Sequence, residues 1–389
     1  MSAAAAPVVR PKVIHLTTTD MSLDWLLAPQ LLAFQAAGYE VVGMSAAGEH
    51  VAHLAALGIR HVDVPSLTRA VGPVADVRAL FELRRLLRAE HPAVLHTHNP
   101  KPGVLGRIAG RLARVPVVVN TQHGLYAQPT DRLRRKLPVY ALERLAAAFG
   151  HQELVQNQED VETLVRTLKV PRRKVTWLGN GIDLARFDGD RSARAAVRTE
   201  WGVGDDDVVI GVVGRLVREK GFAEIVGAAQ LLRERGVTAP IVVVGPADPD
   251  KRDGLDAAAL SAASALGIHF VGRRSDMPQC YAAMDIFLTA THREGFPRAA
   301  MEASASGLPI IATDIRGCRQ VVDDGVTGVL VQVRDAEALA DATQELVGDG
   351  EARTRMGTAA AAKARKEFDQ QRVIDVTLAT YAHLLGAQS

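Results

Sequence analysis

Two carboxylates with the potential to do chemistry, Glu294 and Glu302, lie eight positions apart around a segment that contains Gly295 and Pro297. The fixed φ of Pro297 suits the first turn of a helix, so we expect Glu294 in a loop and Glu302 about one turn inside that helix. The N–H groups at such a helix start attract anions. Carboxylates can accept hydrogen bonds from the hydroxyl groups of a sugar and of a ribose, and the anion site can hold a diphosphate. The arrangement therefore suits a sugar nucleotide.

A second segment, residues 214–221, supplies cations for the same phosphates. It follows the apolar run 210–213 and therefore lies at the end of a predicted strand. Arg215 can hold phosphate oxygens through two hydrogen bonds, and Lys220 acts as a point charge. Each such charged hydrogen bond contributes roughly 1.5–3 kcal/mol. The competing interpretation is an ordinary solvated loop.

The composition narrows the class of protein. A chain of 389 residues favours two domains over one. The 46 basic and 44 acidic residues nearly cancel, which argues against nucleic-acid binding through bulk charge. Cys280 and Cys318 are too few for a disulfide framework or a cysteine zinc site, and they fit a reducing compartment. No apolar run is long enough to span a membrane, and residues 1–7 lack the features of a signal peptide, so we expect a cytoplasmic protein.

The elements that must position these residues alternate along the whole chain. Short apolar runs are separated by segments with helical spacing, which predicts βαβ units and parallel sheets covered on both faces. The predicted strands comprise residues 13–16, 41–45, 94–97, 117–120, 153–156, 208–213, 241–244, 268–271, 286–289, 309–313 and 329–331. Pro29 interrupts the first helical pattern and predicts either a kink or the true start of that helix.

The alternation pauses between residues 180 and 207, where polar and turn-forming residues gather. We therefore predict a boundary near residue 185, between a first domain of residues 1–185 and a second of residues 186–367. Residues 368–389 follow as a helical C-terminal segment. In open α/β sheets, ligands bind at the carboxyl ends of the strands.

Taken together, these motifs resemble the retaining GT-B glycosyltransferases of glycosyltransferase family 4. The likeness is strongest from residue 180 to residue 331 and includes the family's G-R-L-x-x-x-K-G pattern at residues 214–221. It implies an α/β fold of two Rossmann-like, doubly wound parallel-sheet domains facing across a cleft. The first domain would bind the acceptor and the second the nucleotide sugar, and the C-terminal helix would cross back to the first domain.

The resemblance also implies roles for individual residues. Glu294 would contact the transferred sugar and Glu302 the ribose. The implied donor-binding residues are Gly214, Arg215, Lys220, Glu294, Gly295, Phe296, Pro297 and Glu302, and the implied catalytic residues are His123, Arg215, Lys220 and Glu294. His123 lies just past a predicted strand, where this family carries a histidine close to donor and acceptor. A purely structural histidine is the alternative.

Other candidate ligands point away from a metal. His96 and His98 are two positions apart, but no cysteine or acid completes a set, and we expect them to shape the floor of the cleft. Two Asp-x-Asp patterns, at Asp188/Asp190 and at residues 248–250, lie in turn-like segments and are interpreted as surface loops. We expect no metal and no cofactor beyond the nucleotide sugar itself. A nicotinamide enzyme lacks its G-x-G-x-x-G fingerprint here.

The implied reaction transfers a hexose or N-acetylhexosamine from a nucleoside diphosphate to an acceptor hydroxyl with retention. By resemblance alone the base is uracil and the pathway is assembly of a cell-surface polysaccharide or lipid-linked glycan. One alternative is transfer to a small soluble acceptor such as an antibiotic aminocyclitol. Another is that the protein is an epimerase or hydrolase on the same fold. Residues 17–22, where many family members have a glycine-rich loop, contain no glycine and leave the acceptor open.

A basic segment could bring the protein to a membrane. Arg132, Arg134, Arg135 and Lys136 open a predicted helix that continues through Leu142 and Leu145. Cations beside apolar residues suit the surface of an anionic membrane, which would place the protein at its inner face. A basic, solvated side of an ordinary core helix explains the same pattern.

Overall fold

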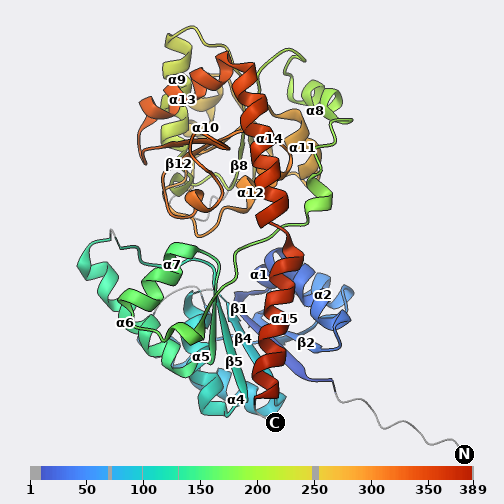
Figure 1. The fold of residues 1–389 in the computed structure, drawn as a ribbon, viewed down its shortest axis with the longest axis vertical. Helices are drawn as coiled ribbons and strands as arrows, with labels where there is room; N and C mark the ends of the chain where they lie inside the picture. The colour runs from blue at the N-terminus through green and yellow to red at the C-terminus, as the bar shows by residue number, and fades with distance from the viewer. Residues whose placement is uncertain (1–9, 69–71, 99, 130, 248–253, 388–389) are drawn as a thin grey trace, which may run out of the picture. The chain divides into compact units, whose positions relative to one another are not determined.

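The computed structural model describes residues 10–68, 72–98, 100–129, 131–247 and 254–387 (Figure 1). The chain forms two compact units. Unit 1 extends to Gly179 and resumes at Gln371, and unit 2 comprises Asn180–Gln370. The division therefore falls after residue 179, close to the pause in the sequence pattern. Each unit is an α/β sandwich built on one parallel sheet, as the alternation of elements predicts.

The sheet of unit 1 has seven parallel strands in the order β3-β2-β1-β4-β5-β6-β7. The strands are β1 (Lys12–Thr19), β2 (Glu40–Ala46), β3 (Arg60–Asp63), β4 (Val94–His98), β5 (Val117–Gln122), β6 (Gln152–Val155) and β7 (Val175–Trp177). The sequence pattern anticipates all of them except β3 and β7, which lie at the two edges of the sheet.

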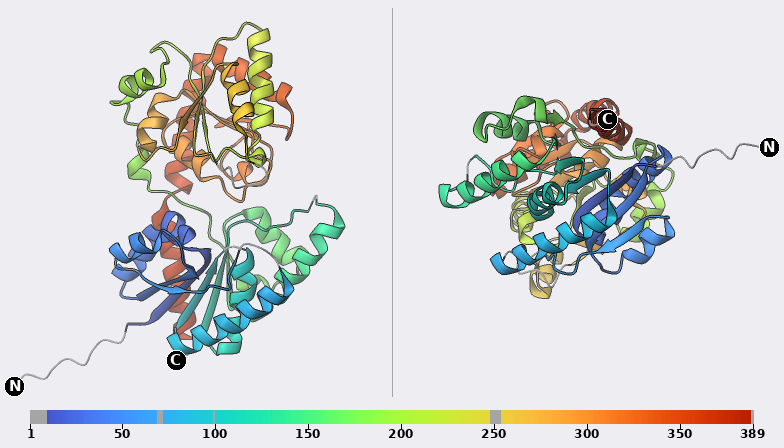
Figure 2. Two further views of the ribbon diagram at one scale, coloured as in Figure 1. Left: turned by 180° about the vertical axis from the view of Figure 1, so that it is seen from behind. Right: turned by 90° about the horizontal axis from the view of Figure 1, so that it is seen from below.

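Helices cover both faces of this sheet. They are α1 (Asp20–Ser22), α2 (Ala28–Ala36), α3 (Val51–Ala56), α4 (Pro73–Glu90), α5 (Pro100–Ala113), α6 (Leu133–Phe149), α7 (Gln158–Glu162) and α15 (Gln370–Gly386). Along β1, Val13 packs with residues of α2 and α15, whereas its neighbour Ile14 packs with residues of α4. Figure 1 shows α15 in front of the sheet, and the reverse view in Figure 2 shows α4 and α5 on the other face.

Pro29 is the second residue of α2 and follows a π-helical turn (Leu23–Leu27) directly. The helical backbone is continuous from Asp20 to Ala36, so the proline lies within a longer helical segment whose regular α-helical hydrogen bonding is interrupted just before it.

The sheet of unit 2 has six parallel strands in the order β10-β9-β8-β11-β12-β13. They are β8 (Ile210–Val213), β9 (Ile241–Val244), β10 (Ile268–Gly272), β11 (Ile286–Thr289), β12 (Ile310–Thr313) and β13 (Gly328–Val331). The helices are α8 (Arg194–Trp201), α9 (Phe222–Glu234), α10 (Ala257–Ser264), α11 (Met277–Ala283), α12 (Arg298–Ala305), α13 (Ala336–Gly348) and α14 (Gly350–Glu367). One core cluster includes α8, α11, α12 and α14, and a second includes α9, α10 and α13.

The last helix completes unit 1. The sequence predicts a helix from residue 368, and α15 begins at Gln370. Val373, Ile374 and Tyr381 of α15 are buried in the same apolar cluster as Val13 and Phe34. The chain therefore returns to its first unit after building the second.

A buried ionic network joins α5 and α6 to the sheet of unit 1. The guanidinium of Arg107 donates to Glu143 at 2.6 Å and to Glu153 at 2.7 Å, and all three side chains are buried. Asn120 of β5 donates to the second oxygen of Glu153 at 2.7 Å. Because each charge is paired and hydrogen-bonded, the network offsets the cost of its burial.

This network predicts a large stability difference. Arg107→Met would leave two buried carboxylates without their cation, so the free energy of unfolding should fall by about 3–5 kcal/mol. Arg166→Met is the matched control, since Arg166 pairs with Glu162 on an exposed helix surface and the loss there should be under about 0.5 kcal/mol. Urea unfolding followed by circular dichroism measures both. Equal midpoints for the two variants would contradict the assignment.

Candidate functional site

The predicted catalytic cations and acids of unit 2 lie at the carboxyl ends of β8 and β11. These strands are neighbours, and the strand order reverses between them, because β9 and β10 extend the sheet beyond β8 while β12 and β13 extend it beyond β11. At such a reversal the connecting loops turn to opposite faces and leave a crevice, which is where open parallel sheets bind ligands. Residues 214–221 follow β8 and residues 290–297 follow β11.

Lys220 and Glu294 meet at this reversal. The Nζ of Lys220 donates to Oε2 of Glu294 at 2.6 Å, and each side chain keeps a little over a quarter of its surface exposed. Gly221 makes this approach possible: its φ is +77°, and a Cβ there would lie 2.0 Å from the carbonyl oxygen of Ala290. The structure thus brings together two predicted residues that are 74 positions apart.

The other predicted residues after β8 have different surroundings. The N–H of Gly214 donates to Val244 at 3.0 Å, so this amide is used within the sheet. Leu216 and Val217 are buried, and they fix the exposed Arg215 between the strand end and Lys220. Arg215 therefore follows the carboxyl end of β8 with an exposed side chain.

The loop after β11 is anchored by its aromatic side chain. The ring of Phe296 is buried against Phe368, with centroids 5.9 Å apart and the planes nearly perpendicular. The ring of Phe296 is therefore part of the core of unit 2 and anchors the loop. A close approach fixes the same loop from another side, because a Cβ at Gly317 would lie 2.4 Å from the carbonyl oxygen of Glu294.

Helix α12 starts directly after this loop. Pro297 precedes the helix with a ψ of 107°, so the helix begins at Arg298, one residue later than the sequence predicts. Its first i→i−4 hydrogen bond runs from Met301 to Pro297 at 3.2 Å, which leaves the earlier amides outside the helical pattern. Gly295 and Pro297 thus lie beside a helix N-terminus, a favourable place for a negative charge.

Glu302 is held by a group that the sequence analysis missed. Its Oε2 accepts from the hydroxyl of Tyr281 at 2.9 Å, and its Oε1 accepts from Nε of Arg298 at 3.1 Å. Burial, followed by the charge of Glu302, raises the pKa of Tyr281 well above its usual value, so the phenol keeps its proton and donates. The position of Tyr281 on α11 carries no motif, and only the fold shows its role.

His123 of unit 1 lies directly after β5 and is partly exposed. Its Nε2 shares a hydrogen bond of 3.1 Å with Nδ1 of His98, and the side chain of Gln156 also hydrogen-bonds it. Desolvation lowers the pKa of His123 to about 4. The ring is therefore neutral near pH 7 and has one donor and one acceptor nitrogen.

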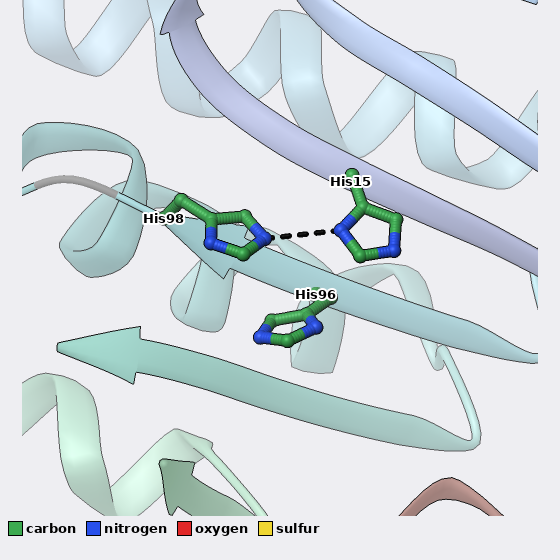
Figure 3. Close-up of side chains that lie close together, drawn as sticks. All are labelled: His15, His96 and His98. Carbon is green, nitrogen blue, oxygen red and sulfur yellow. Dashed lines mark hydrogen bonds between the residues drawn. The ribbon is translucent and has the colours of Figure 1, made fainter. Parts of the chain in front are cut away.

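His96 and His98 gain a third partner that the sequence analysis did not single out, His15 of β1. The three rings are fully buried at the reversal of strand order between β1 and β4 (Figure 3). One nitrogen of each ring lies within 4.8 Å of the others, a spacing at which three imidazoles could surround a metal ion. Each of these rings also has hydrogen-bond partners within the protein. His15 is the one polar residue in the apolar run 13–16, and that was the available signal.

The loop after β1 has a different anchor from a glycine-rich loop. The carboxylate of Asp20 accepts from the backbone of Met21 and of His50, both at 2.9 Å. The neighbouring Asp24 accepts from the ring nitrogens of His50 and His53 at 2.8 and 2.7 Å. These bonds tie the loops after β1 and β2 together, and Gly48 leaves room for the carboxylate of Asp20, which would lie 2.8 Å from a Cβ at that position.

The Asp-x-Asp pattern at residues 188–190 forms an exposed turn. Asp190 accepts from the backbone and the hydroxyl of Ser192, both at 2.9 Å. The second pattern, Asp248-Pro249-Asp250, lies outside the described residues.

Helix α6 combines charge with exposed apolar side chains. Tyr140, Glu143, Ala146 and Ala147 form its buried side. Its exposed leucines are Leu133, Leu137, Leu142 and Leu145, each between 50 and 65% exposed. Arg132, Arg134, Arg135 and Lys136 lie at its start. Leu142 and Leu145 are therefore exposed, on a helix whose other side is buried in unit 1. None of the helices in the described ranges is long and apolar enough to cross a membrane.

Comparison with known proteins identifies the class. The family profile "Glycosyl transferases group 1" matches residues 193–363, and "Glycosyltransferase Family 4" matches residues 31–186. An Escherichia coli UDP-Gal:alpha-D-GlcNAc-diphosphoundecaprenol alpha-1,3-galactosyltransferase is 30% identical over 75% of this chain and 76% of its own. The capsular polysaccharide glycosyltransferase CapM of Staphylococcus aureus is 26% identical over 92% of this chain and 94% of its own.

Solved structures agree in fold. HepE of Anabaena, solved with UDP and glucose, superposes with a TM-score of 0.79 over 96% of this chain and 100% of its own at 20% identity. A sucrose-phosphate synthase from Thermosynechococcus elongatus gives 0.81 over 97% and 100%, also at 20% identity. The fold is GT-B, and the chain belongs to the family 4 glycosyltransferases.

The buried histidines predict an acid-sensitive unit 1. Burial lowers the pKa of His15 from 6.5 to about 3, and it lowers the pKa values of His96 and His98 well below 6.5. Below about pH 6.5 the unfolded chain binds protons that the folded chain does not. The free energy of unfolding should therefore fall on acidification, by up to about 1.4 kcal/mol per pH unit for each ring.

Urea unfolding between pH 7 and pH 5, above the range where most carboxylates titrate, measures this slope. His15→Gln should make it shallower. The exposed His383 provides the control, and His383→Gln should leave the slope unchanged. A flat profile in the unmodified protein would contradict the neutral state of the three rings.

Proposed function

We propose that this protein transfers a hexose or N-acetylhexosamine from a UDP-sugar to a hydroxyl of a lipid-linked glycan, with retention at the anomeric carbon. The observation that carries the proposal is the 2.6 Å contact between Lys220 and Glu294 at the strand reversal of unit 2. In this proposal Lys220 is the cation for the phosphate and Glu294 the carboxylate for the sugar hydroxyls, and the contact supports it because these two groups would meet at the reacting bond of a nucleotide sugar.

The surrounding residues divide the work on the donor. Arg215 and Lys220 neutralise the diphosphate and stabilise the charge that develops as it leaves. The N-terminus of α12 adds amide donors close to Gly295 and Pro297. Glu302, oriented by Tyr281, accepts hydrogen bonds from the ribose. In this proposal fixed cations and amides do the work that a metal ion does in other transferases.

The proposed chemistry is front-face attack. The acceptor oxygen forms a bond to the anomeric carbon on the side from which the diphosphate departs, and the proton of the acceptor hydroxyl passes to a phosphate oxygen. In this proposal Glu294 binds a sugar hydroxyl and is not a covalent nucleophile, and its Oε2 accepts from Lys220 at 2.6 Å. In unit 1, His123 is neutral and suited to hydrogen-bond a sugar hydroxyl.

A lipid-linked acceptor is supported by two observations. The Escherichia coli relative is named for a diphosphoundecaprenol substrate. Helix α6 exposes four leucines next to four cations, an arrangement that suits the surface of an anionic membrane. The protein would then work at the inner face of the cell membrane. A small soluble acceptor would leave this surface without a purpose.

Removing either member of the central pair should abolish most turnover. We expect Lys220→Ala and Glu294→Ala each to lower kcat at least ~100-fold, the scale of losing a fixed electrostatic group. Lys363→Ala is the matched control, because Lys363 of α14 forms a similar 2.5 Å pair with Asp323. This variant should keep full activity. The assay is UDP release from UDP-galactose with GlcNAc-diphosphoundecaprenol. Unchanged rates in both site variants would refute the assignment, and equal UDP release without acceptor would indicate a hydrolase.

Calorimetric titration with UDP and with GDP, in the presence of EDTA, tests the donor separately. UDP should bind, and Lys220→Ala should weaken it by roughly tenfold or more, the loss of one charged hydrogen bond. Tight binding of GDP in place of UDP would overturn the choice of base. Binding only after metal is restored would overturn the metal-independent mechanism.

Membrane binding should depend on α6. The unmodified protein should sediment with liposomes that contain phosphatidylglycerol, and reversal of charge in Arg134→Glu with Arg135→Glu should release it, since each cation contributes about 1 kcal/mol at the surface. Arg84→Glu with Arg85→Glu on α4 is the control for net charge. Equal sedimentation of both double variants would contradict a specific role for α6.

A further inference from the structure

A line of hydrogen-bonded rings connects α15 to His123 inside unit 1. It begins at the buried hydroxyl of Tyr381 and passes through imidazoles of β1 and β4, which Figure 3 shows side by side. Nothing in the proposed reaction requires polar rings at this depth. The first member lies on the last helix of the chain, and the final member is the histidine proposed to meet the sugar.

Two branches leave the hydroxyl of Tyr381. In the short branch it contacts Nδ1 of His96, whose Nε2 lies 2.7 Å from the hydroxyl of Thr121. In the long branch it lies 3.5 Å from Nε2 of His15. The contact with His96 is the closer of the two.

The long branch continues to the site. Nδ1 of His15 lies 3.0 Å from Nε2 of His98, and Nδ1 of His98 lies 3.1 Å from Nε2 of His123. Both nitrogens of His15 and of His98 are therefore engaged along the line. Each hydrogen bond between two nitrogens needs one proton and one lone pair.

All members of the line are neutral near pH 7. Burial raises the pKa of Tyr381 well above its usual value, and burial lowers the pKa values of the imidazoles. A neutral imidazole carries one N–H only. The protons must then all point the same way along the line, so that the position of one fixes the rest.

The single proton of Tyr381 decides the direction. If it points along the closer contact to Nδ1 of His96, the Nε2–H of His96 donates to Thr121, and Tyr381 can only accept from His15. His15 then carries its proton on Nε2, and its Nδ1 accepts from Nε2–H of His98. The Nδ1 of His98 in turn accepts from the next ring.

We propose that Tyr381 is a positioning residue that fixes the tautomer of His123 through His15 and His98. The proton of His123 is held on Nε2 and Nδ1 is an acceptor, so the side chain of Gln156, which also hydrogen-bonds this ring, can meet Nδ1 only as a donor. A hydroxyl that meets Nδ1 must donate to it. The effect on turnover rests on the proposed function, whereas the tautomer itself does not.

The same rings are the candidate metal cluster, and the two arrangements exclude each other. A metal ion needs a lone pair from each of the three histidines, whereas the hydrogen bond between Nδ1 of His15 and Nε2 of His98 already uses one nitrogen of each of these two rings. The hydrogen-bonded line satisfies every ring without a charge. It is therefore the arrangement that we infer.

Nitrogen-15 NMR of histidine-labelled, full-length protein reads the tautomer directly, because protonated and unprotonated ring nitrogens have separate shifts and couplings. In the unmodified protein Nε2 of His123 should be the protonated nitrogen. Tyr381→Phe should convert His123 to a mixture of tautomers. Tyr39→Phe, which removes the hydroxyl of a ring packed on Tyr381, should change nothing.

Thr121→Val is a second test, and it predicts a complete change of the His123 tautomer where Tyr381→Phe predicts a mixture. It removes the acceptor of His96 Nε2–H, so His96 should place its proton on Nδ1 and donate to Tyr381. The phenol proton would then turn to His15 and move the proton of His123 to Nδ1. Thr97→Val is the matched control, since its hydroxyl bonds Asn120 at 2.8 Å away from the line.

Several results would overturn the proposal. They are a proton on Nδ1 of His123 in the unmodified protein, an unchanged tautomer in Tyr381→Phe and Thr121→Val, and stoichiometric zinc that is lost in His15→Gln. If the proposed function also holds, Tyr381→Phe should lower kcat about tenfold or more with little change in KM for the donor. An inactive enzyme with the expected tautomer would refute the function and leave this inference standing.

Discussion

The reversal of strand order is the constraint on which both candidate clusters depend. In unit 1 it falls between β1 and β4, and in unit 2 between β8 and β11. At each reversal the chain leaves neighbouring strands toward opposite faces, and the carboxyl ends remain uncovered by a connection. Unit 2 places the pair Lys220 and Glu294 there, whereas in unit 1 the buried His15 meets His98 deeper in the sheet, between the same kind of neighbouring strands. Residues far apart in sequence meet because the strands that follow the first strand are added to the sheet on both of its sides.

The two clusters use polar groups in opposite ways. The pair in unit 2 keeps part of its surface in water, so a ligand can exchange partners with Lys220 and Glu294 at modest cost. The histidines in unit 1 are sealed between the sheet, Phe34 and α15, and they satisfy one another. Close by, Arg107 and its two glutamates show the third solution, in which full charges are buried and paired. The buried histidines and the buried ion pairs thus stabilise the interior of unit 1, whereas the partly exposed pair in unit 2 stays available to a ligand.

Much of this could be predicted from the sequence, for identifiable reasons. Central strands are buried on both faces and read as apolar runs, so β1, β4 and β8 are legible. The edge strands β3 and β7 are short and carry charged or exposed residues, so no pattern marks them. Arg215, Lys220 and Glu294 are visible because a motif carries them. The support of Glu302 by Tyr281, and of His123 by His15, depends on contacts across the fold that no local spacing encodes.

The return of the chain to unit 1 has a consequence for how the protein is made. Unit 2 is continuous in sequence, whereas unit 1 needs residues that are synthesised after all of unit 2. Until α15 is made, unit 1 lacks Val373, Ile374 and Tyr381, which are buried in one apolar cluster with Val13 and Phe34. Synthesis therefore completes the second unit before the first, reversing the usual order in which N-terminal domains fold. A nascent chain that stops before α15 would therefore carry a complete unit 2 and an incomplete unit 1.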